Sequence, residues 1–329
     1  GHYDFKNFLG TNTPNFIPPY LKMVDPYIGE TATDNRLVTV VGDDPLPDMA
    51  IGRLPVNTYD EINSMVSKIV AYETAPLSGD WNLRHLFISD NPDSAGNFWE
   101  LSNAVADVLV RPPYVASKIY YGQPPYTSPL PTRQAIVNAY NQGALIISYV
   151  GHSSIPWWAA EILFSTTQVP LLNNQERTPI MLPMTCYDGY YHDPRFPSLG
   201  ETVVRVNGRG AVASWSATGL GVAHGHDYLE RGFYTSVFSN GNPNLGDATT
   251  AGKVSLYLGD PRFLDLLDTF LLLGDPAMNV ALVDTDLQVN DQLAPAGPVA
   301  QNQMVTYTMQ YTNTGPAAAT ATRLNLQMP

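Results

Sequence analysis

The sequence has few of the features that cross-link a protein or that bind it to nucleic acid or a membrane. It contains a single cysteine in 329 residues, which excludes an internal disulfide framework. Its 17 lysines and arginines form no run, so we expect no nucleic-acid partner. No stretch approaches the roughly 20 consecutive apolar residues that a membrane-spanning helix requires, so we expect no membrane span.

What the chain does contain favours a secreted or cell-surface protein with a large core. Hydrophobic residues make up 44% of the sequence, enough to bury a sizeable interior. The formal net charge is −13, although only 14% of residues are charged. Together with 28 prolines and 19 tyrosines, this composition is typical of an extracellular protein rich in ordered loops.

Short apolar segments alternate with amphipathic ones along most of the chain, which predicts an α/β fold. Strands are predicted at 37–41, 50–54, 85–89, 117–121, 144–150, 178–185 and 210–215. Helices are predicted at 60–72, 98–110, 132–142, 165–173, 228–238 and 248–258. Two of the strand segments, 144–150 and 178–185, are almost continuously apolar. Such runs are typical of central strands in a parallel sheet with helices on both faces.

Changes in composition along the sequence divide the chain into three regions. Residues 1–80 are expected to form a first, smaller subdomain, and residues 81–283 the main α/β subdomain. From 284 onward charged residues become rare, and β-like patterns follow at 305–312 and 320–326. Residues 284–329 therefore predict the beginning of an immunoglobulin-like β-sandwich, which would pack on the main domain or on further C-terminal β domains.

Two chemically interesting residues directly follow the two most apolar strands. His152 comes just after the strand 144–150, and Cys186 just after the strand 178–185. Sites in open parallel α/β sheets form beyond the carboxyl ends of the strands. If the two strands are neighbours, both side chains face one crevice, and an imidazolium near a thiol lowers the thiol pKa. A buried structural cysteine beside a strand-end histidine is the alternative.

Several motifs resemble, in their order along the chain, the gingipain family of cysteine peptidases, which has the caspase-type fold of clan CD. Together they cover roughly residues 1–283, and the histidine and cysteine lie 34 residues apart. The motifs are Val41-Gly-Asp-Asp44, Ala50-Ile-Gly-Arg-Leu54, Lys68-Ile-Val-Ala-Tyr-Glu73, Tyr149-Val-Gly-His-Ser-Ser-Ile-Pro-Trp-Trp158, Met184-Thr-Cys-Tyr-Asp-Gly189 and Leu273-Gly-Asp-Pro276.

The resemblance implies peptide-bond hydrolysis by a Cys–His dyad that needs no catalytic cofactor. Cys186 would attack the substrate carbonyl, and His152 would protonate the leaving amine. The backbone N–H groups of Cys186 and Ser153 would form the oxyanion hole. The family has glycine after the histidine, where this chain has Ser153, but a backbone donor is available from either residue.

The resemblance also implies a carboxylate that orients the histidine and residues that bind substrate. Asp90 and Asp93 both lie on the loop where the family carries that carboxylate, and we expect Asp90 to fill the role. Trp158 matches a tryptophan that lines the family's substrate cleft, although a core tryptophan is equally compatible with its position. Glu100 lies near the position of the acidic residue that selects basic substrates in the best-known members.

Structural calcium and further protein partners are implied in the same way. The family commonly binds calcium, and Asp43 and Asp44 are the candidate ligands. Gly1 corresponds to a point partway through the family's fold, so strands of the first subdomain are expected upstream. We therefore expect an N-terminal fragment, separated by proteolytic maturation, as a non-covalent partner.

Three functions follow from these patterns. The first is a secreted or surface-bound bacterial endopeptidase acting on proteins or peptides. The second is a sortase-like transpeptidase, in which an amine rather than water resolves the acyl-enzyme. The third is a structural surface protein that keeps the peptidase fold, which the presence of both Cys186 and His152 argues against.

Overall fold

The computed structural model describes residues 1–77, 79–283, 287–294 and 297–313. The chain forms two compact units, 1–281 and 282–329. The boundary expected after residue 283 thus falls two residues beyond the observed one. The boundary expected after residue 80 does not separate compact units, because a strand from the first 80 residues joins the central sheet. Within the described ranges, no helix is both long and apolar enough to cross a membrane.

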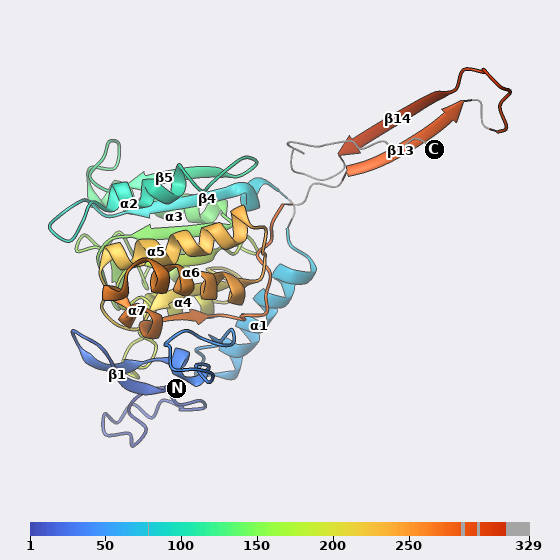
Figure 1. The fold of residues 1–329 in the computed structure, drawn as a ribbon. Coiled ribbons are helices and arrows are strands. Elements are labelled where there is room, and N and C mark those ends of the chain that lie inside the picture. Colours follow the sequence, from blue (N-terminus) through green and yellow to red (C-terminus); the bar gives the residue numbers. More distant parts are fainter. Residues whose placement is uncertain (78, 284–286, 295–296, 314–329) are drawn as a thin grey trace. The chain divides into compact units, whose positions relative to one another are not determined.

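A seven-stranded sheet forms the centre of the first unit (Figure 1). Its strands, in order across the sheet, are β3 (Gly52–Arg53), β12 (Phe270–Leu273), β11 (Ala213–Ala217), β10 (Ile180–Met184), β6 (Ile146–Val150), β4 (Arg84–Ser89) and β5 (Val115–Tyr120). The five strands from β11 to β5 are parallel, whereas β12 runs antiparallel to β11 and parallel to β3. The predicted α/β fold is confirmed, with a mixed rather than wholly parallel sheet.

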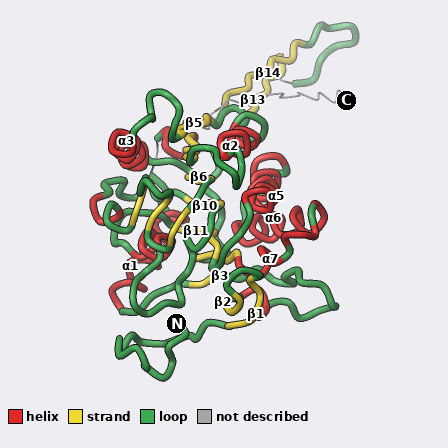
Figure 2. Tube along the Cα trace, turned by 90° about the vertical axis from the view of Figure 1, so that its left-hand side faces the viewer, coloured by secondary structure: helices red, strands yellow, loops and turns green. Residues whose placement is uncertain are grey.

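Helices cover both faces of this sheet (Figure 2). One face carries α1 (Tyr59–Thr74) and α3 (Pro129–Gln142), with α4 (Leu199–Arg205) against α1. The other face carries α2 (Phe98–Ala106), α5 (Ala223–Tyr234), α6 (Leu245–Gly259) and α7 (Asp265–Thr269). Capping boxes at Thr58 and Ser198 begin α1 and α4, each closed by a glutamate three residues later.

The core lies where the sequence is most continuously apolar. Every residue of β6 and of β10 is buried, because helices cover the sheet on both sides there. The two strands lie within the predicted ranges, whereas α5 begins five residues before the predicted 228–238 and α4 was not predicted. Burial at about 25 cal/mol per Å² of apolar surface is the main stabilising contribution to such a centre.

Two predicted elements are wrong. Residues 38–41, expected as a strand, follow a 3-10 helix (Asp34–Leu37) and are irregular, with their N–H groups at 40 and 41 bonded to the Asp48 carboxylate. Residues 165–173, expected as a helix, contain the end of β9 and a short 3-10 turn (Val169–Leu171), since Pro170 and the side-chain bonds of Ser165 favour a turn.

Smaller sheets complete the description. In the first unit, β1 (Leu21–Asp25) and β2 (Gly29–Ala32) form an antiparallel hairpin. The strands β7 (Ser153–Ser154), β8 (Trp157–Trp158) and β9 (Phe164–Ser165) form a three-stranded antiparallel sheet directly after His152.

The second unit contains an antiparallel pair, β13 (Leu287–Ala294) and β14 (Thr306–Asn313). The strand expected at 305–312 is therefore confirmed as β14. The β-like stretch 320–326 lies outside the described residues, so the immunoglobulin-like sandwich stays a prediction.

Candidate active site

The strand pairing brings His152 and Cys186 to one edge of the sheet. β6 and β10 are parallel neighbours, and their last residues, Val150 and Met184, are partners in the register. The chain order also reverses direction between β4 and β6, because β5 lies outside β4 while β10 lies beyond β6. The crevice beyond such a reversal is where open α/β sheets bind ligands. The expectation that the two strands are neighbours is confirmed.

The loops that follow these two strands are bonded to each other. Thr185 donates its hydroxyl hydrogen to the Gly151 carbonyl at 2.6 Å, and its Oγ1 lies 2.9 Å from Oγ of Ser153. Ser153 in turn donates to the carbonyl oxygen of Cys186. These hydrogen bonds join the histidine loop to the cysteine loop and restrain the two catalytic candidates relative to each other.

The Cys186 thiol is partly buried and lies against a third loop. Its Sγ donates a hydrogen bond to the carbonyl oxygen of Gly221 at 3.6 Å. Both Cys186 and His152 lie in the described part of the chain, and no hydrogen bond joins the thiol to the imidazole there. Burial raises the pKa of the Cys186 thiol. The expectation of a thiol pKa lowered by the imidazole is therefore wrong for the free protein.

The backbone at the cysteine is suited to bind an oxyanion. The residue that follows, Tyr187, has a left-handed φ of 54° and donates its N–H to Gly219 O at 2.9 Å. A non-glycine residue in this region is strained and is held there by its surroundings. Among the described residues, the Cys186 N–H finds no hydrogen-bond acceptor, so it is available to a ligand. The role of the Ser153 N–H stays a prediction.

The imidazole of His152 is held by Asp93. Its Nε2 lies 2.8 Å from Asp93 Oδ2, and the ring contacts Phe98 edge-on with centroids 5.2 Å apart. Both partners of the ion pair are about half exposed, at 50% and 42%. The Ala95 N–H and the His152 imidazole hold the pKa of Asp93 below its ordinary value.

Asp90, the residue expected to orient the imidazole, contacts the histidine backbone instead. Its Oδ2 accepts the His152 N–H at 3.4 Å, and its Oδ1 accepts the N–H of Asn91 at 2.8 Å. Asp90 follows β4 directly, so its buried side chain faces the end of β6, whereas Asp93 lies farther along the loop and reaches the exposed ring. Asp90 is thus placed to support the backbone of the site, and the orienting contact belongs to Asp93.

Trp158 does not line a cleft, because its side chain is 0% exposed. It stacks on Tyr149 with ring centroids 4.3 Å apart and donates Nε1–H to Asp188 Oδ1 at 2.7 Å. Tyr149 donates its hydroxyl hydrogen to the carbonyl oxygen of His152 at 2.6 Å. Trp158 therefore connects the cysteine loop, through Asp188, with the residues that hold the histidine.

Glu100 and the candidate calcium ligands are not drawn into the site by any described contact. Glu100 is exposed in the first turn of α2, where its N–H bonds to the Asn97 side chain. Asp44 caps its own turn by accepting the Leu46 N–H at 2.9 Å. In the described ranges, no group of three or more His, Cys, Asp or Glu side chains could hold a metal ion. Calcium also binds backbone carbonyl oxygens, so a calcium site at Asp43 and Asp44 stays a prediction.

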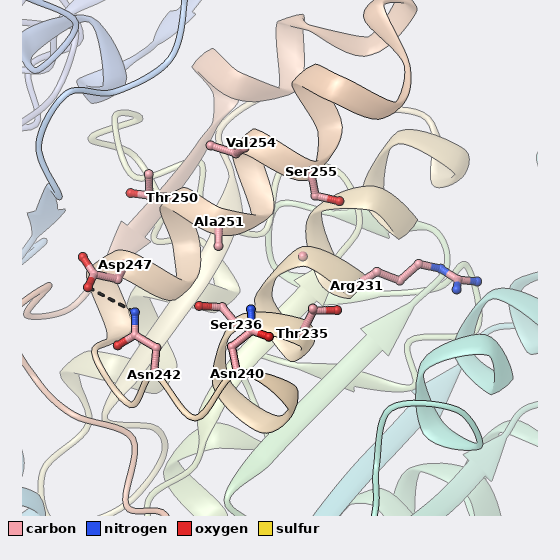
Figure 3. Close-up of a pocket in the computed structure, with 11 residues that line it drawn as sticks. Arg231, Thr235, Ser236, Asn240, Asn242, Asp247, Thr250, Ala251, Val254 and Ser255 are labelled. Atoms are coloured by element: carbon pink, nitrogen blue, oxygen red, sulfur yellow. Dashed lines mark hydrogen bonds between the residues drawn. The ribbon is translucent and has the colours of Figure 1, made fainter.

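A cavity elsewhere in the first unit takes no part in this arrangement. It lies between α5, the π-helical turn Thr235–Ser239 and α6, and about half of the residues that line it carry hydroxyl or amide side chains (Figure 3). In it, Asn242 donates to Asp247 at 3.2 Å. Neither Cys186 nor His152 lines it.

The sequence interpretation missed Thr185 and Asp188, although both flank the cysteine. A hydroxyl directly before the nucleophile and a carboxylate two residues after it were the available signals. Burial raises the pKa of Asp188 to about 7, although the hydrogen bonds from Trp158 and Ser216 oppose this increase. Asp188 is fully buried, so these two donors are what makes its charge tolerable.

Comparison with known proteins finds relatives of this chain among the gingipains. Gingipain R2 of Porphyromonas gingivalis is 26% identical over 286 residues, which are 80% of this chain and 36% of the relative. Lys-gingipain of the same organism is 23% identical over 256 residues, 75% of this chain and 14% of the relative. This chain thus spans about a third or less of these relatives.

The solved structures agree on the fold. The Arg-specific cysteine proteinase gingipain R superposes with a TM-score of 0.69 at 22% identity, over 79% of this chain and 62% of that one. The complex of the RgpB pro- and mature domains gives 0.69 at 23% identity, over 79% and 64%. The model of peptidase family C25 matches residues 1–281, the whole first unit. The chain therefore belongs to peptidase family C25.

Proposed function

We propose that this chain is a cysteine endopeptidase that hydrolyses peptide bonds with Cys186 as nucleophile and His152 as general acid and base. The observation that carries the proposal is the paired ending of β6 and β10, which places these two residues on cross-linked neighbouring loops. Membership of peptidase family C25 supports the same chemistry.

In this scheme the thiol proton leaves during the attack. Burial keeps the resting thiol protonated, with Sγ bonded to Gly221 O, so substrate binding must turn the thiol toward the imidazole. Sγ then bonds to the carbonyl carbon while His152 accepts the thiol proton. The imidazolium passes that proton to the leaving amine as the C–N bond breaks. Water next attacks the thioester, and its proton returns through His152 to the departing thiolate.

Two further groups support these steps. The Nε2–H of His152 donates to Asp93, which leaves Nδ1 free for proton transfer and stabilises the imidazolium that forms. The Cys186 N–H would bind the oxyanion of the tetrahedral intermediate. One donor of this kind lowers the activation free energy by on the order of 3 kcal/mol.

The substrates are proposed to be proteins or peptides outside the cell. The acidic, loop-rich composition favours a secreted or surface-bound enzyme. Two relatives carry arginine or lysine specificity in their names, and Glu100 is the candidate acid for such a preference here. One solved relative is a complex of pro- and mature domains, which supports a non-covalent partner segment for this chain as well.

The test combines labelling with a cleavage profile. We expect a peptidyl chloromethylketone to label wild type under reducing conditions but not Cys186→Ala. Wild type should cleave members of a peptide library, and His152→Ala should lose at least about 100-fold in kcat/KM. Glu100→Gln should weaken an Arg- or Lys-restricted profile if Glu100 selects the substrate.

Other results would point elsewhere. Ligated products after addition of an amine would identify a transpeptidase. An unlabelled Cys186 with no cleavage of the library would leave only a scaffold role and would refute the enzyme proposal. Cleavage that survives Cys186→Ala would refute the assignment of the nucleophile.

A further inference from the structure

The loop 218–221 is hydrogen-bonded to the loop that carries Cys186, the proposed nucleophile. Two of its carbonyl groups accept hydrogen bonds from the cysteine loop: Gly219 O from the Tyr187 N–H at 2.9 Å, and Gly221 O from the Cys186 thiol at 3.6 Å. The first of these bonds anchors the strained residue that follows the cysteine. The position of the thiol therefore depends on the position of loop 218–221.

That loop is itself held by a residue from the far N-terminal part of the chain. Asp25, at the end of β1, is 4% exposed, and its Oδ2 accepts the N–H of Leu220 at 2.6 Å. Its Oδ1 accepts the N–H groups of Tyr27 and Ile28 at 2.7 and 3.0 Å. The hydrogen bonds from its own turn hold the carboxylate in place, and the carboxylate in turn holds the loop.

The contact between Asp25 and the loop leaves no spare room. A methyl group on residue 219 would lie 2.2 Å from Asp25 Oδ2, so only glycine fits. A second buried link adds to the first, because Thr31 donates to the Thr218 carbonyl at 2.6 Å and Thr218 donates to the Ala32 carbonyl at 2.7 Å. The hairpin β1–β2 therefore holds loop 218–221 at two points, residues 218 and 220.

We infer that Asp25 is a positioning residue for Cys186, acting through loop 218–221 and the Tyr187 N–H. The inference rests on the proposed function, since it assigns Asp25 a part in orienting the nucleophile of that reaction. It makes the N-terminal hairpin, remote in sequence from the dyad, a component of the catalytic apparatus.

The charge of Asp25 has an effect that opposes its geometric role. Burial, and to a smaller degree the Asp25 carboxylate, raise the pKa of the Cys186 thiol. The other ionisable groups that interact with Asp25 are Tyr187 and Asp265. Removing this carboxylate should therefore let the thiol ionise at lower pH while it releases the loop. A variant that gains thiolate but loses peptidase activity separates positioning from general damage.

The first variant is Asp25→Asn in the full chain. An asparagine keeps the shape but cannot offer a carboxylate to both the turn and the Leu220 N–H. We expect kcat/KM for a peptide substrate to fall roughly 10- to 100-fold, mostly in kcat, as for a misplaced nucleophile. We also expect the pH midpoint of Cys186 alkylation by iodoacetamide to move to lower pH. Glu30→Gln, an exposed carboxylate on β2 of the same hairpin, should change neither quantity.

A second variant separates geometry from charge. Gly219→Ala displaces the loop from Asp25 without removing the carboxylate, so kcat/KM should fall while the alkylation midpoint does not move to lower pH. Wild-type kcat/KM in both Asp25→Asn and Gly219→Ala, with unfolding temperatures near that of wild type, would overturn the inference. If wild type cleaves no peptide, the proposed function fails. The alkylation midpoint then tests only the electrostatic effect of Asp25, because an unchanged value in Asp25→Asn contradicts an interaction between its carboxylate and the thiol.

Discussion

The hydrogen bond between Trp158 and Asp188 leads to the sharpest prediction, because two interpretations of Trp158 differ in their consequences. The family resemblance implied a place in the substrate cleft, with a core position equally compatible, and the structure buries Trp158 as a link between the histidine and cysteine loops. Replacing it by phenylalanine keeps an aromatic ring against Tyr149 but removes the Nε1–H. Oδ1 of Asp188 then has no donor from the indole, and only Ser216 still bonds to the carboxylate.

The magnitude follows from the burial of the carboxylate. A hydrogen bond to a charged group contributes about 1.5 to 3 kcal/mol, and the smaller ring adds the cost of a cavity. We therefore expect the free energy of unfolding to fall by about 2 to 4 kcal/mol in Trp158→Phe at pH 8. The loss should be smaller at pH 6. Burial raises the pKa of Asp188 to about 7, so at pH 6 the folded state is mostly protonated and needs the donor less.

The pH dependence of this penalty follows from the linkage between protonation and folding. The unfolded-state pKa of Asp188 is the same in both proteins, and the loss of a donor raises the folded-state pKa further in the variant. The additional penalty of the variant therefore accrues as pH rises through about 7 and stays at its full value above the variant's own pKa.

Urea unfolding at pH 6 and pH 8, together with steady-state kinetics, measures both effects. We expect kcat to fall in Trp158→Phe, since the link between the loops is weakened, with little change in KM. Trp157→Phe on the same strand, whose side chain is only partly buried, is the matched control for stability. A raised KM with unfolding free energies within about 0.5 kcal/mol of wild type at both pH values would refute the link and restore the cleft assignment.

Three other predictions follow from buried or crowded groups. Burial raises the pKa of Glu230 from 4.5 to about 8, so wild type should lose up to about 5 kcal/mol of unfolding free energy relative to Glu230→Gln between pH 4.5 and 8, measured by urea unfolding. Gly151→Ala places a methyl group 2.4 Å from Cβ of Asp90, so it should cost about 1 to 3 kcal/mol in unfolding free energy and lower kcat/KM. Asp93→Asn should reduce kcat about 10- to 100-fold by releasing the His152 ring, yet change stability by less than about 1 kcal/mol because the ion pair is half exposed.

Each of these has a control within the chain. The exposed Glu176→Gln should show no pH-dependent difference from wild type, and a flat difference for Glu230→Gln would contradict a shifted pKa. Gly208 has open space around it, so Gly208→Ala tests only backbone strain and should leave kcat/KM unchanged. Full activity in Asp93→Asn would show that the imidazole is oriented by other contacts.

The sequence predicted the sheet centre and the neighbouring placement of His152 and Cys186 because both depend on strong local signals. The apolar runs of β6 and β10 can only be buried between helices, and parallel strands bring their carboxyl ends to the same edge. By contrast, residues 37–41 have strand-like composition but are not a strand. The amides of Val40 and Val41 are bonded to the carboxylate of Asp48, and both side chains are exposed, so a local side-chain contact outweighed β propensity.

The details around the dyad could not be predicted, because they depend on contacts between loops. Asp90 and Asp93 lie on the same loop, and only the turn at Asp93 decides which carboxylate meets the exposed imidazole. Contacts of this kind have no periodicity in the sequence. The environment of Cys186 was misjudged for the same reason, since an adjacent imidazole was expected to lower its pKa.

The protonation state of the resting thiol limits the possible mechanisms more than the neighbouring placement of His152 and Cys186 does. A preformed thiolate–imidazolium pair requires the two groups to be bonded, but Sγ faces Gly221 O and the imidazole faces Asp93. Because burial disfavours the thiolate, ionisation has to be coupled to the attack on a bound carbonyl. The rate of iodoacetamide alkylation, which needs the thiolate but no bound peptide, should therefore remain low at neutral pH in an enzyme that is fully active on peptides.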